Sequence, residues 1–182
     1  MDKLTLAIEF AAKAHNGMVR KKDKTPYILH PLEAATIVGT MTSDQDVISA
    51  AVLHDVVEDT EITIDEIEDL FGNRVRKLVE SETEDKRADL PPSSTWRIRK
   101  EESLNVLKNA EDIAVLIVWL GDKLANIRAI YRDFLIEGSS VCNKFHQSDV
   151  NVQAWYYRSI LKYTERISHT LAWKEYKTLV EK

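Results

Sequence analysis

Apolar residues recur at spacings of three and four positions along most of this chain, which is the pattern of helices that bury one face. Stretches that alternate apolar and polar residues, as half-buried strands do, are scarce. The pattern therefore predicts an all-α fold. The first predicted helix covers residues 2–15, and its apolar positions are Leu4, Leu6, Ala7, Phe10, Ala11 and Ala14.

Capping signals predict where several helices begin and end. Ser43 or Asp44 can cap the start of a helix that we expect to run through "AAVLHDVVEDTEIT". Thr63 and Glu66 have the spacing of a capping box, and Gly72 is a suitable stop for the helix that they begin. The sequence "LHPLEAATIVGTM" starts another helix, with a proline in its first turn. Further helices are predicted at 73–86, 95–109, 111–134, 150–167 and 170–182, with loops at "NGMVRKKDKTPY" and "RADLPPSSTW".

Composition restricts the possible partners. The 182 residues are 44% hydrophobic and 30% charged, with a net charge of -5, so general affinity for nucleic acid or an anionic membrane is not expected. The single cysteine, Cys142, cannot form an internal disulfide. The N-terminus lacks the apolar centre of a signal peptide, and no apolar run approaches the roughly 18 residues that span a bilayer. We expect a soluble, cytoplasmic protein.

Four ionisable side chains lie within six positions of an otherwise apolar segment: His54, Asp55, Glu58 and Asp59. Such a cluster offers a divalent metal one nitrogen and one oxygen ligand, with carboxylates beside it to handle protons. Taken separately, a satisfied His–Asp pair and a solvated helix end also explain these residues. Two adjacent acids at a helix C-terminus are, however, unfavourable to the helix dipole.

Candidate partners for this cluster lie elsewhere in the chain. His30, in "PYILHP", is at a loop-to-helix junction. Asp122 interrupts a long apolar helix, where an unpaired carboxylate is costly to bury. A metal would remove that cost, and so would an ion pair with Lys123 or Arg128. Asn126 follows Asp122 by one turn and can face the same cavity.

The order His30, His54–Asp55, Asp122 resembles the H…HD…D pattern of the HD-domain metal-dependent phosphohydrolases. More narrowly, "TPYILHPLEAA", "AAVLHDVVEDTEITIDEIEDLFG", "VRKLVESETEDK" and "GDKLANIRAI" resemble the hydrolase domain of the RelA/SpoT-homologue family, especially its single-domain small alarmone hydrolases. The resemblance covers about residues 4–131. We therefore expect one HD hydrolase domain over 1–182, an all-α helical bundle in which residues 132–182 form C-terminal helices that pack on this core.

The resemblance implies a reaction and a metal site. It implies hydrolysis of the 3′-pyrophosphate of (p)ppGpp, which yields GDP or GTP and pyrophosphate. The implied metal is manganese, and the acids that serve the water and its protons are Glu58 and Asp59, whose roles the sequence does not divide. The implied metal ligands are His30, His54, Asp55 and Asp122.

A substrate with two diphosphates also requires cations. Arg20, Lys21 and Lys22 lie shortly before His30, and Lys86 and Arg99 lie further along. A solvated basic face is the alternative explanation for the last two. The family commonly has Arg-Lys where this chain has Lys21-Lys22, and lysine lacks the planar, bidentate guanidinium.

Asn126 matches a nucleotide-contacting residue of the family, but Ala129 stands where a hydroxyl residue is common. The choice between (p)ppGpp and (p)ppApp therefore stays open. We expect His15 to pack near the site without being a ligand, and the aromatic residues 155–157 to pack against the bundle.

The expected partner is a small nucleotide, and the oligomeric state is not predicted. Two alternative functions remain. One is an HD phosphohydrolase or phosphodiesterase for another nucleotide, and the other is a non-catalytic nucleotide-binding module.

Overall fold

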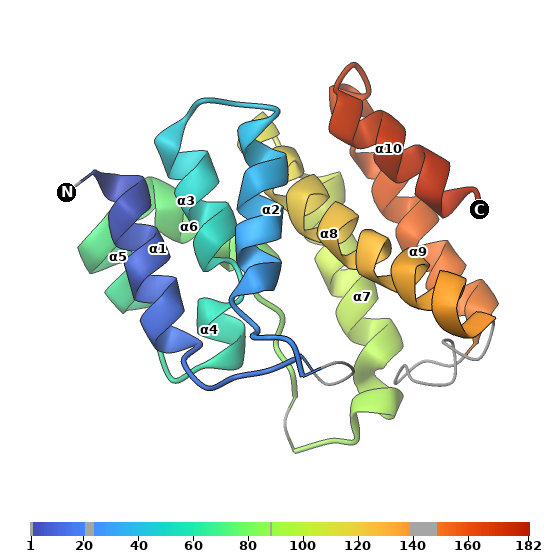
Figure 1. Ribbon diagram of the computed structural model, residues 1–182, viewed down its shortest axis with the longest axis horizontal. Coiled ribbons are helices and arrows are strands. Elements are labelled where there is room, and N and C mark those ends of the chain that lie inside the picture. The colour runs from blue at the N-terminus through green and yellow to red at the C-terminus, as the bar shows by residue number, and fades with distance from the viewer. Residues whose placement is uncertain (1, 21–23, 88, 139–148) are drawn as a thin grey trace.

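The computed structural model describes residues 2–20, 24–87, 89–138 and 149–182 (Figure 1). Within these ranges the regular structure is helical, apart from one isolated antiparallel bridge between Val19 and Pro26. The predicted all-α class is confirmed. The helices are α1 (Lys3–Ala14), α2 (Leu29–Gly39), α3 (Gln45–Leu53), α4 (Val56–Asp59), α5 (Ile64–Phe71), α6 (Asn73–Glu82), α7 (Pro92–Lys108), α8 (Ile113–Glu137), α9 (Val150–Tyr163) and α10 (Leu171–Val180), with a 3-10 turn, η2 (Glu165–Ile167).

Helix α8 is the centre of the molecule. It packs along α2 and also contacts α3, α6, α7, α9 and α10. Figure 1 shows α1 and α3 to α6 on one side of α2, and α7 to α10 on the other. Because α8 reaches both groups, a side chain near its middle lies at their junction.

Gly121 is the point of closest approach between α2 and α8. A Cβ atom there would lie 2.5 Å from Val38 Cγ2 and 3.0 Å from the carbonyl oxygen of Ala34. Glycine lets the two backbones meet, which brings His30 on α2 and Asp122 on α8 into the same region. The surrounding core includes Val52, Leu53, Trp119 and Leu120, all almost fully buried.

Helix capping follows the sequence signals. Asp44, not Ser43, caps α3, and its side chain accepts a hydrogen bond from the backbone N–H of Asp46. Thr63 and Glu66 form the reciprocal capping box of α5, which ends at Gly72.

The continuous helix expected through "AAVLHDVVEDTEIT" is wrong. Helix α3 ends at Leu53, and α4 begins only at Val56, so His54 and Asp55 form a junction between two helices. The backbone is distorted from ideal helical geometry at Asp55, which has φ -93° and ψ -6°. On one straight helix the two side chains would diverge by about 100°. The break lets both face the same cavity.

Other boundaries also differ from prediction. Helix α6 stops at Glu82, four residues earlier than expected, because residues 83–86 turn toward α4 and α7. Helix α7 starts at Pro92, inside the predicted loop, with this proline in its first turn. Helix α9 ends at Tyr163, four residues before the predicted end, and the 3-10 turn η2 follows it, whereas α10 lies within the predicted range 170–182. Helix α10 packs on α8, and α9 packs on α7. None of the helices in the described ranges combines the length and apolarity that a bilayer crossing requires.

Candidate metal centre and cleft

Four side chains from three parts of the fold converge at one point. His30 comes from the start of α2, His54 and Asp55 from the α3–α4 junction, and Asp122 from the middle of α8. His30 Nε2 lies 3.0 Å from Asp122 Oδ1 and 3.5 Å from Asp55 Oδ2. His54 Nε2 lies 3.1 Å from Asp55 Oδ2 and 3.4 Å from Asp122 Oδ1. Two nitrogens and two oxygens thus alternate around a common centre.

The tautomer of His54 is fixed by its neighbour. Its Nδ1 donates a hydrogen bond to the carbonyl oxygen of Ala51 over 2.9 Å. In the neutral ring, Nε2 therefore carries a lone pair, the form in which imidazole binds metals. This buried Nε2 makes no hydrogen bond of suitable geometry with any described residue, although two carboxylates lie close to it.

The carboxylates of Asp55 and Asp122 make the environment of the two histidines electrostatically negative. Burial alone would lower the pKa of His54, but Asp55 and Asp122 outweigh it and hold that pKa well above its usual value. Burial would likewise raise the pKa of Asp122, but Lys123 and then His54 hold it well below its usual range. Two carboxylates beside two imidazoles thus form an environment that attracts a cation.

These residues fit a divalent cation. His30, His54 and Asp122 each offer one ligand atom, and the three atoms lie within 4.8 Å of one another. Asp55 Oδ2 lies close enough to both histidines to be the fourth. A set of two imidazole nitrogens and two carboxylate oxygens suits first-row metals such as manganese or zinc.

Each carboxylate of this set has its own hydrogen-bond partner. The hydroxyl of Tyr27 donates to Asp55 Oδ2 over 2.7 Å. The side-chain amide of Asn126 donates to Asp122 Oδ1 over 2.6 Å. Lys123 forms an ion pair with Asp122 Oδ2. Asn126 thus faces the cavity, as expected from the one-turn spacing, and the ion pair with Lys123 is one of the two that the sequence offered for Asp122, while the role of Tyr27 was not predicted.

The two candidate acids lie on α4, directly after the ligand pair. Burial is the main reason that the pKa of Glu58 is raised, and the nearby Asp55 and Glu84 add to the effect. Lys86 forms an ion pair with Asp59, and its Nζ lies 3.6 Å from Glu58 Oε1. The backbone N–H of Glu84 donates to Glu58 Oε2 over 3.4 Å.

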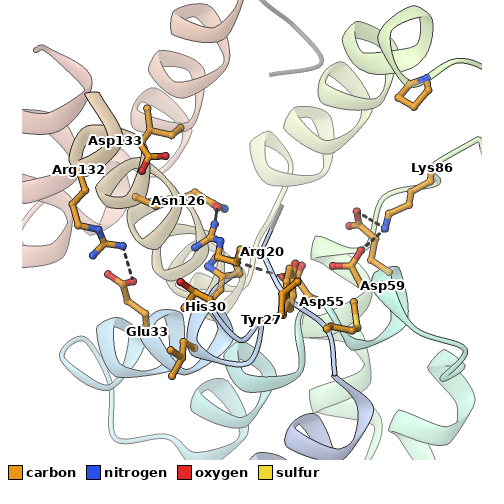
Figure 2. Close-up of a pocket in the computed structure, with 18 of the residues that line it drawn as sticks. Arg20, Tyr27, His30, Glu33, Asp55, Asp59, Lys86, Asn126, Arg132 and Asp133 are labelled. Carbon is orange, nitrogen blue, oxygen red and sulfur yellow. Dashed lines mark hydrogen bonds and ion pairs between the residues drawn. The ribbon is translucent and has the colours of Figure 1, made fainter. Parts of the chain in front are cut away.

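A cleft of about 940 Å³ opens over these groups. Figure 2 shows Lys86 and Asp59 at one end of the view, Arg132, Asp133 and Glu33 at the other, and the candidate ligands His30 and Asp55 between them. Arg20 reaches into the cleft and donates to Asn126 Oδ1 over 3.4 Å. A cleft of this size accommodates a nucleotide with several phosphates.

The predicted cationic residues have different positions. Arg20, Lys86 and Arg99 line the cleft. Arg99, however, donates to Glu84 over 2.9 Å, so its charge is already partnered. Lys21 and Lys22 lie outside the described residues, as does Cys142.

Other aromatic and histidine residues surround the site. His15 is buried and packs on Tyr27, with ring centroids 5.0 Å apart, and it is not part of the ligand cluster. Tyr156 packs on Trp96, whereas Tyr157 also lines the cleft. For residues 155–157 the sequence favoured packing against the bundle over a base-stacking platform, because an aromatic residue on an amphipathic helix is usually core, and Tyr157 departs from that expectation by lining the cleft.

The sequence of this chain matches a known family and several known proteins. A family model described as HD domain matches residues 7–138. The guanosine-3′,5′-bis(diphosphate) 3′-pyrophosphohydrolase of Aquifex aeolicus is 36% identical over 130 residues, which cover 71% of this chain and 18% of that protein. A protein of Myxococcus xanthus named GTP pyrophosphokinase is 34% identical over 132 residues, or 71% of this chain and 17% of that one. This chain thus spans less than a fifth of the length of these two relatives.

Two solved structures resemble the whole fold. One, described as a metazoan ortholog of SpoT that hydrolyzes ppGpp, has a TM-score of 0.78 and 24% identity, and the match covers 100% of this chain and 95% of that one. The other, lmo0812 from Listeria monocytogenes EGD-e, has a TM-score of 0.73 and 31% identity, with 84% and 96% covered.

Proposed function

Because this chain belongs to the HD-domain family, we propose that it is a metal-dependent hydrolase of a nucleotide 3′-pyrophosphate. The preferred substrate is (p)ppGpp, or its close relative (p)ppApp, and the products are the nucleoside 5′-di- or triphosphate and pyrophosphate. The Aquifex aeolicus relative carries the name of this reaction. We propose manganese as the metal and the cytoplasm as the location.

The observation that carries the proposal is the alternating set of four donor atoms beside two further carboxylates in one cleft. The proposed ligands are His30, His54, Asp55 and Asp122. A divalent ion held there lowers the pKa of water and offsets negative charge on phosphoryl oxygens.

Glu58 and Asp59 then handle protons. The raised pKa of Glu58 makes this carboxylate a stronger base than an ordinary glutamate, which suits the removal of a proton from the attacking water. Asp59 lies beside it and forms an ion pair with Lys86. Lys86 is also placed to balance charge on the departing pyrophosphate.

The remaining groups of the cleft bind and orient the nucleotide. Arg20 supplies a guanidinium that can hold a phosphate with two hydrogen bonds or stack on a base. Its contact with Asn126 places it next to the proposed metal centre. Arg20 thus offers the planar group that the pair Lys21-Lys22 lacks. Arg99 contributes through Glu84, which it fixes, more than by direct charge.

Adenine alarmones are the second candidate substrate. Ala129 lines the cleft and offers no side-chain hydrogen bond with which to distinguish the edge of guanine from that of adenine. The test is to incubate the purified protein and manganese with ppGpp, ppApp, cyclic dinucleotides and dNTPs, and to identify the products. Release of pyrophosphate from the first two alone supports the proposal. Cleavage restricted to the others would favour a different HD phosphohydrolase, and binding without any cleavage a non-catalytic module.

A further inference from the structure

A buried ion pair that the proposed reaction does not use lies directly behind the metal centre. Lys123 contacts Asp122 Oδ2 on one side, and its Nζ lies 3.3 Å from Glu82 Oε2 on the other. The side chains are only 13% exposed for Lys123 and 1% exposed for Glu82. Neither was among the candidate residues of the sequence, where Lys123 was considered only as a partner of Asp122.

The ammonium group of Lys123 is held from several directions. It lies over the ring of Trp119, 4.8 Å from the centroid, where the negative face of an indole attracts cations. Trp119 is itself fixed, because its Nε1 donates to the carbonyl oxygen of Ser81, next to Glu82. The lysine therefore has little freedom to leave Asp122.

The two carboxylates around Lys123 are not equivalent. Burial raises the pKa of Glu82 to about 7, although Lys123 opposes the shift, and no described residue pairs with its Oε1. Asp122 Oδ2, by contrast, is in direct contact with the ammonium group, whereas Glu82 Oε2 lies 3.3 Å from it. The charge of Lys123 thus serves Asp122, and Glu82 orients the lysine.

We propose that Lys123 is a positioning residue that acts as the resident counter-ion of the metal-free centre. It holds the buried Asp122 in ligand geometry before the cation arrives, and Glu82 fixes the lysine in that place. Two charges removed from water are costly unless each has a partner. Because the lysine supplies one, the site can form without its metal. The proposal rests on the proposed metal centre and on no particular substrate.

This role has an unusual consequence for metal affinity. Loss of a neutral outer partner of a metal ligand usually weakens metal binding by about 10–100-fold. Lys123 is a cation, however, so it repels the incoming ion as well as fixing its ligand. Removing its charge should destabilise the metal-free protein and make the bound metal contribute more to stability.

The test is thermal unfolding of wild-type protein and Lys123→Met, each in EDTA and in excess manganese. The expected result is a lower Tm for the variant in EDTA and a larger manganese-induced rise in Tm than in wild type, since a ligand stabilises by its affinity for the folded state. An equal or smaller rise in the variant overturns the proposal. If the methionine variant does not fold, the same Tm values are measured on Lys123→Gln, which keeps a hydrogen-bond donor without the charge.

Three matched variants complete the experiment. Lys123→Arg keeps the charge and should restore the wild-type rise. Tyr27→Phe removes the neutral partner of Asp55 and should reduce the rise, the opposite direction. Lys3→Met breaks a half-exposed ion pair with Asp46, between α1 and α3, and should leave the rise unchanged.

The measurement on the wild-type protein distinguishes a failure of the metal centre from a failure of the counter-ion role of Lys123. If manganese does not change its Tm, the metal centre itself is wrong and this inference falls with it. If the rise is present but identical in the Lys123 variants, only the counter-ion role is wrong.

Discussion

At the scale of single residues, four carboxyl groups of one region, two of them buried and two half-buried, have pKa values displaced in opposite directions. Asp55 and Asp122 are held low, because histidines and Lys123 outweigh the effect of burial. Glu58 and Glu82 are raised, because burial dominates and cations reach them less well. Environment thus divides one chemical group into anions suited to bind metal and bases suited to accept a proton.

The metal ligands give the first prediction. Asp122→Asn should abolish manganese binding and hydrolysis together, since the amide is a weaker ligand and leaves Lys123 without its anion. Calorimetric titration with manganese and pyrophosphate release measure the two effects. A mainly helical circular dichroism spectrum is the control for folding. Full activity of the metal-stripped variant would contradict the ligand assignment.

The second prediction concerns proton transfer. Glu58→Gln or Asp59→Asn should lower kcat by at least about 100-fold, the usual scale of general acid–base catalysis, while manganese affinity stays within about threefold of wild type. Glu61→Gln, an exposed acid just beyond α4, is the matched control. Unchanged turnover in both single variants would return the two carboxylates to a structural role.

The third prediction concerns Arg20. Arg20→Ala should raise the KM for ppGpp about tenfold or more, because charge-assisted contacts with a phosphate contribute roughly 1.5–3 kcal/mol. Added salt should reproduce part of the effect by screening. Steady-state kinetics at two ionic strengths measures both. An equal loss with a small artificial phosphoester would point instead to damage at the metal centre.

At the scale of elements, the helices could be predicted from the sequence but the break between α3 and α4 could not. Periodicity reports which face of a segment is apolar, and both sides of the break keep that pattern. The departure at Asp55 depends on His54 bonding to Ala51 and on tertiary partners such as Tyr27. The early end of α6 has the same origin, since the side chain of Glu84 pairs with Arg99 and Lys100 of α7. These tertiary contacts replace a further turn of α6.

Gly121 gives the prediction at this scale. Gly121→Ala should destabilise the protein by about 1–3 kcal/mol, because the added methyl overlaps Val38 and presses on the carbonyl of Ala34. The forced separation of α2 and α8 should also weaken manganese binding, since each helix carries a ligand. Urea unfolding and metal titration measure the two effects.

Gly39→Ala is the control for this change. Gly39 ends α2, and a Cβ there meets no described atom within 4 Å, so stability should stay equal or rise by about 0.4–1 kcal/mol. A Gly121→Ala protein as stable as wild type would show that the two helices do not need this close contact.

At the scale of the whole molecule, the stability of the metal-free protein should depend on pH through Glu82. The pKa of this group is about 7 when folded, against 4.5 ordinarily, so the folded state binds its proton more tightly. The resulting stability is fully present below about pH 4.5 and is lost as the pH rises to about 7, by up to roughly 3 kcal/mol. Glu82→Gln should remove this decline.

The measurement is urea unfolding in EDTA between pH 5 and 7.5, read as wild type minus Glu82→Gln so that contributions from His54 largely cancel. A falling difference is expected. Parallel curves for the two proteins would mean that Glu82 does not titrate in this range.

The sequence pointed to the candidate metal ligands more readily than to the residues that surround them. The residue types of His30, His54–Asp55 and Asp122 made them candidates, and their resemblance to the H…HD…D pattern grouped them as one ligand set. Tyr27, Glu82 and Tyr157 belong to ordinary amphipathic or loop patterns, and only packing brings them to the site. Sequence signals identify the groups that react more readily than those that hold them.

The ligands come from segments far apart in the chain, and this affects the time course of folding as well as the chemistry. Bringing such segments together requires closing long loops, whose entropic cost precedes any gain from the ion. The four donor atoms can surround a cation only after α8 has docked on α2 and α3. Interactions that form so late leave the rate of folding almost unchanged and act on the rate of unfolding. A cation bound by these four groups would therefore lengthen the lifetime of a fold that it does not help to build.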